Sequence, residues 1–144
     1  MPYAYVVEDH RDTANCLAQW LRLFNYEVRI ALGPLAAIEA LAGRVPEVIF
    51  LDIHMHGMDG VELCRYIRRD PRTADVALIA MSSDTHPPLL ERIRQAGANG
   101  FLAKPLDIQA LEDALAAVEQ ARATRARPAP AWPAGLPAAW PAAR

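Results

Sequence analysis

The sequence predicts a single α/β domain in which helices cover both faces of a parallel sheet. Short apolar runs alternate five times with amphipathic stretches, which is the pattern of repeated strand–helix units. The chain has 144 residues, 53% of them hydrophobic, which is enough to bury one ordinary core. Polar and charged residues directly follow several apolar runs, as expected where the strands of such a sheet end.

Five apolar runs are short enough to be strands. Polar residues, glycine or proline bound each of them, and these residues are typical of strand ends and loops. The expected strands are Tyr3–Val7, Glu27–Ala31, Val48–Leu51, Val76–Met81 and Gly100–Ala103.

Apolar residues at helical spacing predict the first two helices. The second helix is expected to begin near Pro34, because proline suits the first turn of a helix. The apolar stripes are Leu17, Trp20, Leu21 and Phe24 in the first helix, and Leu35, Ile38 and Leu41 in the second.

The third helix follows Asp59, a favourable N-cap, and is expected to bury Val61, Cys64 and Ile67. Cys64 and Cys16 are the two cysteines of the chain, and each lies on the apolar side of an expected helix. We therefore expect two buried, reduced thiols rather than a disulfide.

Cap residues and prolines place the fourth helix. Asp84 or Thr85 is expected to cap it, with Pro87 and Pro88 in the first turn. Gly97 is expected to end this helix, since glycine readily adopts the left-handed conformation that follows many helices.

The fifth helix begins after Asp107, and residues 1–122 then complete the predicted domain. Its apolar stripe is Ile108, Leu111, Leu115 and Val118. Residues 123–144 change to an Ala/Pro-rich composition with no apolar period, which indicates a tail. The tail contains Trp132 and Trp140, which we expect to dock on a folded surface.

Composition excludes several classes of protein. The net charge is −2 and no long basic run is present, so direct nucleic-acid binding is not expected. The chain shows neither a signal-peptide pattern nor an apolar run of membrane-spanning length. We therefore expect a cytoplasmic protein that does not bind membranes.

The residues that follow the strands form a coherent chemical set. Glu8 and Asp9 follow the first strand, Asp52 the third, Ser82 the fourth and Lys104 the fifth. Three carboxylates at one edge of a sheet would repel one another unless a cation lay among them. Oxygen ligands favour Mg²⁺, whereas the lysine and the hydroxyl suit the oxygens of a nearby phosphoryl group.

Four segments together resemble the receiver domain of two-component response regulators, of which the chemotaxis response regulator is the best-known member. They are Val6–Asp9, Leu51–Gly60, Ile79–Ser82 and Gly97–Pro105. The resemblance covers residues 3–122. It implies a flavodoxin-like (βα)5 doubly wound fold with strand order 2-1-3-4-5.

The resemblance also implies a role for each site residue. Asp52 would be the phosphoacceptor, and Lys104 and Ser82 would contact the phosphoryl group. Mg²⁺ would be held by Glu8, Asp9, Asp52 and the backbone carbonyl of His54. Ser82 and Phe101 match the family's conformational switch pair, although Phe101 could equally be a permanent core residue.

Three loop positions distinguish this chain from other members of the family it resembles. One departs from the usual residue and two are variable in the family; they hold His56, and His54 and Asp84, respectively. His56 stands where the family usually has proline, so the loop after Asp52 is expected to be less rigid. In the family that this chain resembles, the positions two residues after the phosphoacceptor and two after the switch serine tend to set the lifetime of the phosphoryl group. In this chain these positions hold His54 and Asp84.

The expected function is a phosphorylation switch, not an enzyme acting on other substrates. A sensor histidine kinase or a phosphotransfer protein would supply the phosphoryl group, and a downstream protein would bind the face made by the fourth helix, fifth strand and fifth helix. The chain could instead be a receiver cut from a hybrid kinase or a DNA-binding regulator, and homodimer formation stays open.

Two enzyme-like or cofactor-binding alternatives share this sheet type. An Mg²⁺-dependent phosphohydrolase of the haloacid dehalogenase kind would carry a second Asp two residues after the nucleophile, where this chain has His54. A flavodoxin-like cofactor binder needs a phosphate-cradling loop after the first strand, where Glu8 and Asp9 would repel a phosphate.

Overall fold

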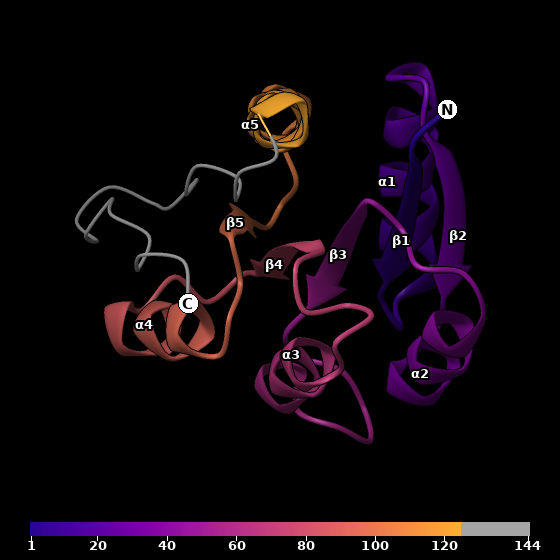
Figure 1. The fold of residues 1–144 in the computed structure, drawn as a ribbon. Coiled ribbons are helices and arrows are strands. Elements are labelled where there is room, and N and C mark those ends of the chain that lie inside the picture. Colours follow the sequence, from indigo (N-terminus) through magenta and orange to yellow (C-terminus); the bar gives the residue numbers. More distant parts are fainter. Residues whose placement is uncertain (125–144) are drawn as a thin grey trace.

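The computed structural model describes residues 1–124, in which strands and helices alternate as predicted (Figure 1). The strands are β1 (Tyr3–Val7), β2 (Glu27–Ala31), β3 (Val48–Asp52), β4 (Ala77–Ser82) and β5 (Gly100–Ala103). The helices are α1 (Arg11–Leu23), α2 (Pro34–Gly43), α3 (Gly60–Arg69), α4 (Pro87–Gln95) and α5 (Ile108–Thr124).

The last helix continues slightly beyond Arg122, where the predicted domain ended. The predicted docking of Trp132 and Trp140 concerns residues that lie outside the described part of the chain. Within residues 1–124, no helix combines the length and the apolar character needed to cross a bilayer.

The sheet is parallel throughout, with strand order β2-β1-β3-β4-β5. This order confirms the doubly wound, flavodoxin-like fold. The order reverses beside β1, because the chain passes from β1 outward to β2 and then returns to β3 on the other side of β1. Such a reversal opens a crevice at the carboxyl ends of β1 and β3.

Helices α1 and α5 cover one face of the sheet, and α2, α3 and α4 cover the other (Figure 1). Alternate residues of each strand point to opposite faces. In β1, for example, Tyr3, Tyr5 and Val7 pack toward α2–α4, whereas Ala4 and Val6 pack toward α1 and α5. All residues of β1, β3 and β4 are buried, as expected for strands with both faces covered.

Three predictions of burial were wrong. Ile108, which was expected on the apolar stripe of the fifth helix, is 40% exposed, because it is the first residue of α5. Cys16 is exposed, because the buried face of α1 runs through Ala14, Leu17 and Leu21 and the cysteine lies beside it. Leu35 is 72% exposed, because α2 buries the face of Ala37 and the leucine projects from the opposite side. Both cysteines are free thiols, as predicted, and Cys64 is buried.

The predicted cap of α3 is confirmed and that of α4 was wrong. The Asp59 side chain accepts a hydrogen bond from the Val61 N–H at 2.9 Å. The N-cap of α4 is His86, not Asp84 or Thr85. Proline fixes the start of the helix at Pro87, so the residue directly before it becomes the cap.

Arg68, in the last turn of α3, joins this helix to the amino ends of β4 and β5. Its guanidinium donates to the carbonyls of Gly97 at 2.8 Å and Val76 at 2.7 Å, and to Asn99 Oδ1 at 2.8 Å. Gly97 has φ +116° and lies so close to Arg68 that a Cβ there would come within 2.4 Å of Arg68 Cγ. Arg68 and Gly97 are therefore structurally dependent on each other.

Candidate functional site

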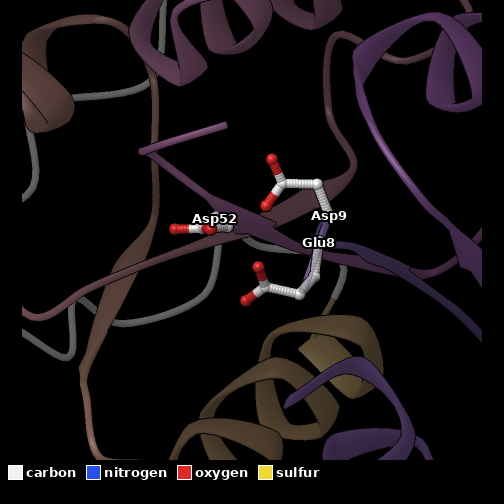
Figure 2. A group of neighbouring side chains, drawn as sticks. All are labelled: Glu8, Asp9 and Asp52. Carbon is white, nitrogen blue, oxygen red and sulfur yellow. The ribbon is translucent and has the colours of Figure 1, made fainter. Parts of the chain in front are cut away.

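The predicted acidic residues and lysine meet at one edge of the sheet. Glu8 and Asp9 directly follow β1, Asp52 is the last residue of β3, and Lys104 directly follows β5. The parallel register brings these strand ends level with one another. One carboxylate oxygen from each of Glu8, Asp9 and Asp52 lies within 4.8 Å of the others (Figure 2). We call these three residues the carboxylate cluster.

Glu8, Asp52 and Lys104 form the buried side of the site. Glu8 is fully buried and Asp52 is only 3% exposed. Lys104 Nζ donates to Glu8 Oε1 at 2.7 Å and lies 3.3 Å from Asp52 Oδ2. The lysine thus links a buried carboxylate to the predicted phosphoacceptor.

Burial and mutual repulsion shape the ionisation of this buried side. The pKa of Glu8 is raised, mainly because burial disfavours the charged carboxylate and also because Asp52 lies beside it. The hydrogen bond from Lys104 lowers this pKa but does not cancel the increase. Burial alone would lower the pKa of Lys104, but its hydrogen bond with Glu8 and the charge of Asp52 outweigh burial and raise it. The lysine is therefore held in its charged form between two carboxylates.

Asp9 and His56 form the exposed side of the site. Asp9 Oδ2 accepts two hydrogen bonds from His56. The backbone N–H donates one at 3.0 Å, and the ring Nδ1 donates the other at 2.9 Å. The backbone hydrogen bond, followed by that of the ring, lowers the pKa of Asp9. Asp9 is therefore held as a carboxylate beside the cluster.

The donor set fits a hard divalent cation. Three carboxylates offer oxygen ligands to one shared space, and Lys104 can neutralise only one of their charges. Mg²⁺ prefers oxygen ligands, octahedral geometry and few protein ligands. The predicted fourth ligand, the backbone carbonyl of His54, belongs to the loop that follows Asp52. In this loop the His54 N–H donates to Asp52 Oδ1 at 3.2 Å.

Ser82 and Phe101 lie on neighbouring strands behind the site. Ser82 is fully buried at the end of β4, and its hydroxyl oxygen accepts a hydrogen bond from the Asp84 N–H at 2.9 Å. Phe101 is 5% exposed and packs in the core on the α2–α4 side of the sheet. Burial of the ring suits a core residue and an inward-turned switch residue equally.

The histidine contact to Asp9 is a feature that sequence reasoning missed. The sequence signal was the replacement of the family's usual proline by His56, which indicated a change in the loop but not its partner. A groove of about 570 Å³ opens next to this contact and is lined by Asp9, His10, Leu32, Gly33, Pro34, Leu35, Ala36, His56, Gly57 and Met58. His10 is exposed and is the N-cap of α1.

Comparison with known proteins gives the same family as the site. Residues 4–116 match the family model described as the response regulator receiver domain. The chain is 32% identical over 103 residues to response regulator PleD of Caulobacter vibrioides, covering 71% of this chain and 22% of that protein. It is 29% identical over 113 residues to the sensory/regulatory protein RpfC of Xanthomonas campestris pv. campestris, covering 77% of this chain and 16% of that protein.

A solved structure agrees with these sequence relatives. The signal receiver domain of a DNA binding response regulator (merR) from Colwellia psychrerythraea superimposes with a TM-score of 0.78 at 32% identity. The superposition covers 83% of this chain and 99% of that one. The chain thus matches less than a quarter of the length of each curated relative, but nearly the whole length of this isolated receiver domain. On the evidence of its fold, its carboxylate cluster and these matches, the chain belongs to the response regulator receiver domain family of two-component signalling.

Proposed function

We propose that this domain is a phosphorylation switch in which Asp52 accepts a phosphoryl group from a phosphohistidine of a sensor histidine kinase or phosphotransfer protein. The observation that carries the proposal is the position of Asp52 within the carboxylate cluster, with Lys104 Nζ 3.3 Å from its Oδ2. A nucleophile held between a cation site and an ammonium group suits transfer of a negatively charged phosphoryl group.

The chain's own residues orient both oxygens of Asp52. The His54 N–H binds Oδ1, and Lys104 lies beside Oδ2. One of these oxygens attacks phosphorus, and a P–O bond forms as the P–N bond of the phosphohistidine breaks. The electron pair of that bond stays on the departing imidazole, which takes a proton from solvent. Mg²⁺, held by the carboxylate cluster and the His54 carbonyl, would neutralise charge on the transferring oxygens.

The output is a change in binding surface, and the only reactions the domain promotes are its own phosphorylation and dephosphorylation. The Ser82 hydroxyl is expected to leave the Asp84 N–H for the phosphoryl group, with Phe101 filling the space behind it. Phe101 lies on β5 and Ser82 pairs with Ala103 of the same strand, so the face of α4, β5 and α5 is the proposed site for a downstream protein. We place this activity in the cytoplasm, where such kinases expose their phosphohistidines.

The test is phosphorylation by a small donor, followed by intact mass. Wild-type protein with Mg²⁺ and acetyl phosphate should gain one phosphoryl group, and EDTA should prevent it. Asp52→Asn should gain none. Asp75→Asn is a matched control, because Asp75 is an exposed aspartate at the opposite end of β4. Equal labelling of Asp52→Asn and wild type would contradict the assignment, as would an unlabelled wild type.

A larger protein containing this receiver is the second candidate. The chain spans only 16% of RpfC and 22% of PleD, so in those proteins the matching region is one part of a longer chain. Under this proposal the same Asp52 chemistry would regulate a linked output, such as a kinase or DNA-binding domain, instead of a separate partner.

A further inference from the structure

His56 binds Asp9 from outside the carboxylate cluster. Within residues 1–124, the ligand atoms that share one space belong to Glu8, Asp9 and Asp52, and the His56 ring is not among them. The ring is fully exposed, and its Nδ1 lies 2.9 Å from Asp9 Oδ2. His56 can therefore act on a bound cation through Asp9, and not as a ligand itself.

Two donors of His56 converge on a single oxygen of Asp9. The backbone N–H donates to Oδ2 at 3.0 Å, and the ring Nδ1 donates to the same oxygen at 2.9 Å. A carboxylate that is held at one oxygen cannot turn freely, so the direction of its other oxygen is fixed as well. Figure 2 shows the Asp9 carboxylate with one oxygen turned toward Asp52 and Glu8, where the proposed cation would lie.

The same contact joins the two loops that carry the proposed cation ligands. Asp9 follows β1, and the loop after β3 runs through His54, the proposed fourth ligand, to His56. This loop is closed tightly, because the Gly60 N–H binds the Ile53 carbonyl at 3.1 Å and a Cβ on Gly60 would come within 2.5 Å of Ile53 Cα. His56 therefore holds Asp9 against a loop of fixed shape.

Hydrogen bonds that hold a metal ligand from outside raise the affinity of a site, because the ligand is already oriented when the cation arrives. The two donors also keep Asp9 charged, since they lower its pKa. Proline, the usual residue of the family at the position of His56, offers neither donor because it has no N–H and no imidazole. An Mg²⁺ site with histidine here should therefore be better prepared for its cation than the same site with proline.

We infer that His56 is a positioning residue for phosphorylation, which holds the Asp9 carboxylate ready for Mg²⁺ without contacting the cation. The inference rests on the proposed function, because it takes the carboxylate cluster as the Mg²⁺ site of a phosphorylated receiver. It goes beyond that function by assigning a role to a residue outside the cluster.

The experiment measures Mg²⁺ dissociation constants by calorimetry for wild type and three His56 variants of the full chain. His56→Ala loses the ring but keeps the backbone N–H, so Mg²⁺ binding should weaken about fivefold, the upper range for an exposed charged contact. His56→Pro loses both donors and should weaken it at least about tenfold. His56→Asn should stay within about twofold of wild type, because its side-chain amide can donate from near the place of Nδ1.

Phosphorylation by acetyl phosphate separates positioning from chemistry. The Mg²⁺ concentration that gives half the maximal rate should rise in parallel with the dissociation constant, whereas the rate at saturating Mg²⁺ should stay within about twofold of wild type. The melting temperatures of His56→Ala and His56→Asn in EDTA should equal that of wild type, because the ring is exposed. His86→Ala removes another exposed histidine, whose ring makes no capping hydrogen bond in α4, and should change none of these values.

Three results would overturn this inference alone, provided that wild type binds Mg²⁺. One is equal or tighter Mg²⁺ binding by His56→Ala and His56→Pro, because the two donors would then compete with the cation for Asp9. Another is a loss in His56→Ala that His56→Asn does not restore. The third is a loss of phosphorylation rate that saturating Mg²⁺ does not restore. Failure of wild type to bind Mg²⁺ would instead overturn the proposed function together with the inference.

Discussion

Lys104 and Arg68 are two partly buried cations at opposite ends of the same strands. Lys104 follows β5 and contacts two carboxylates, those of Glu8 and Asp52. Arg68 lies beside the amino ends of β4 and β5 and donates to neutral oxygens, among them the Val76 carbonyl and the Asn99 side chain. Within residues 1–124, the contacts of Lys104 are with charged groups, whereas the hydrogen bonds of Arg68 described above go to neutral dipoles.

This difference separates function from stability within one sheet. Carboxylates can change partners when a cation or a phosphoryl group arrives, so the contacts of Lys104 can be exchanged. The backbone carbonyls around Arg68 do not bind a cation or a phosphoryl group in the proposed function. Removing the arginine would leave them without this hydrogen-bond donor, which costs free energy of folding. The end of the sheet near Lys104 should therefore respond to mutation mainly in its chemistry, and the end near Arg68 mainly in folding stability.

The largest expected effect is on chemistry, in Asp9→Ala. This change removes one ligand from the carboxylate cluster at a partly exposed position, so phosphorylation by acetyl phosphate should slow by at least about 1,000-fold, or about 4 kcal/mol in the barrier. Its free energy of unfolding, measured with urea, should stay within about 1 kcal/mol of wild type. Wild-type phosphorylation kinetics in this variant would remove Asp9 from the site.

Arg68→Met should show the reverse pattern. Loss of the guanidinium leaves several backbone carbonyls unpaired, so the free energy of unfolding should fall by about 2–4 kcal/mol. The folded fraction should be phosphorylated at the wild-type rate. Arg69→Met, a change at the exposed neighbouring arginine, should cost no more than about 0.5 kcal/mol. Similar losses in the two variants would contradict the proposed role of Arg68.

Glu8→Gln should have opposite effects on stability and binding. Burial raises the pKa of Glu8, so the folded protein holds this proton more tightly than the unfolded chain does. The stability that Glu8 contributes is therefore present below its unfolded pKa and is lost as pH rises through the folded pKa. In EDTA at pH 7, Glu8→Gln should be more stable than wild type by on the order of 1 kcal/mol, yet bind Mg²⁺ at least about tenfold more weakly.

The pH dependence provides the control for Glu8→Gln. Its stability advantage should shrink as pH falls toward 4.5, the ordinary pKa of a glutamate. Urea unfolding of both proteins in EDTA across this range measures the difference. A variant less stable than wild type at neutral pH would show that the Lys104 contact outweighs the burial of Glu8.

The smallest expected effect concerns the lifetime of the phosphorylated state. His54 and Asp84 lie on the loops after β3 and β4, and the Asp84 carboxylate is oriented by the His86 N–H at 2.9 Å. Removing either side chain should open the approach of water, so His54→Ala and Asp84→Ala should each accelerate dephosphorylation several-fold, or less than about 1 kcal/mol per change. Decay followed by intact mass with saturating Mg²⁺ tests this. Parent rates in both variants would contradict it.

The sequence predicted the strands and the carboxylate cluster well because both depend on local pattern. An apolar run followed by a carboxylate marks a strand end, and parallel pairing then brings such ends together, as it does for Glu8 and Asp52. Asp59 was predicted as a cap for a similar local reason. The chemical roles assigned to these residues remain predictions that the experiments above address.

The rest was hidden because its partners lie far away in the chain. Arg68 reads as an ordinary solvated residue at a helix end, yet it binds Gly97 and Asn99, which follow a further strand and helix. The contact between Asp9 and His56 likewise spans two intervening strand–helix units. Cys16 was misplaced because apolar character alone does not fix which side of a helix faces the core.

The partly exposed strand β2 has a consequence for association between copies of the chain. It lies at the end of the sheet and pairs with β1 on one side, so its other side presents backbone groups that a second strand could bind. Glu27 and Arg29 place charges at its exposed positions, and Arg44 bridges to Glu27 at 3.3 Å. These charges oppose edge-to-edge addition of another chain, so β2 is protected against growth of the sheet into aggregates.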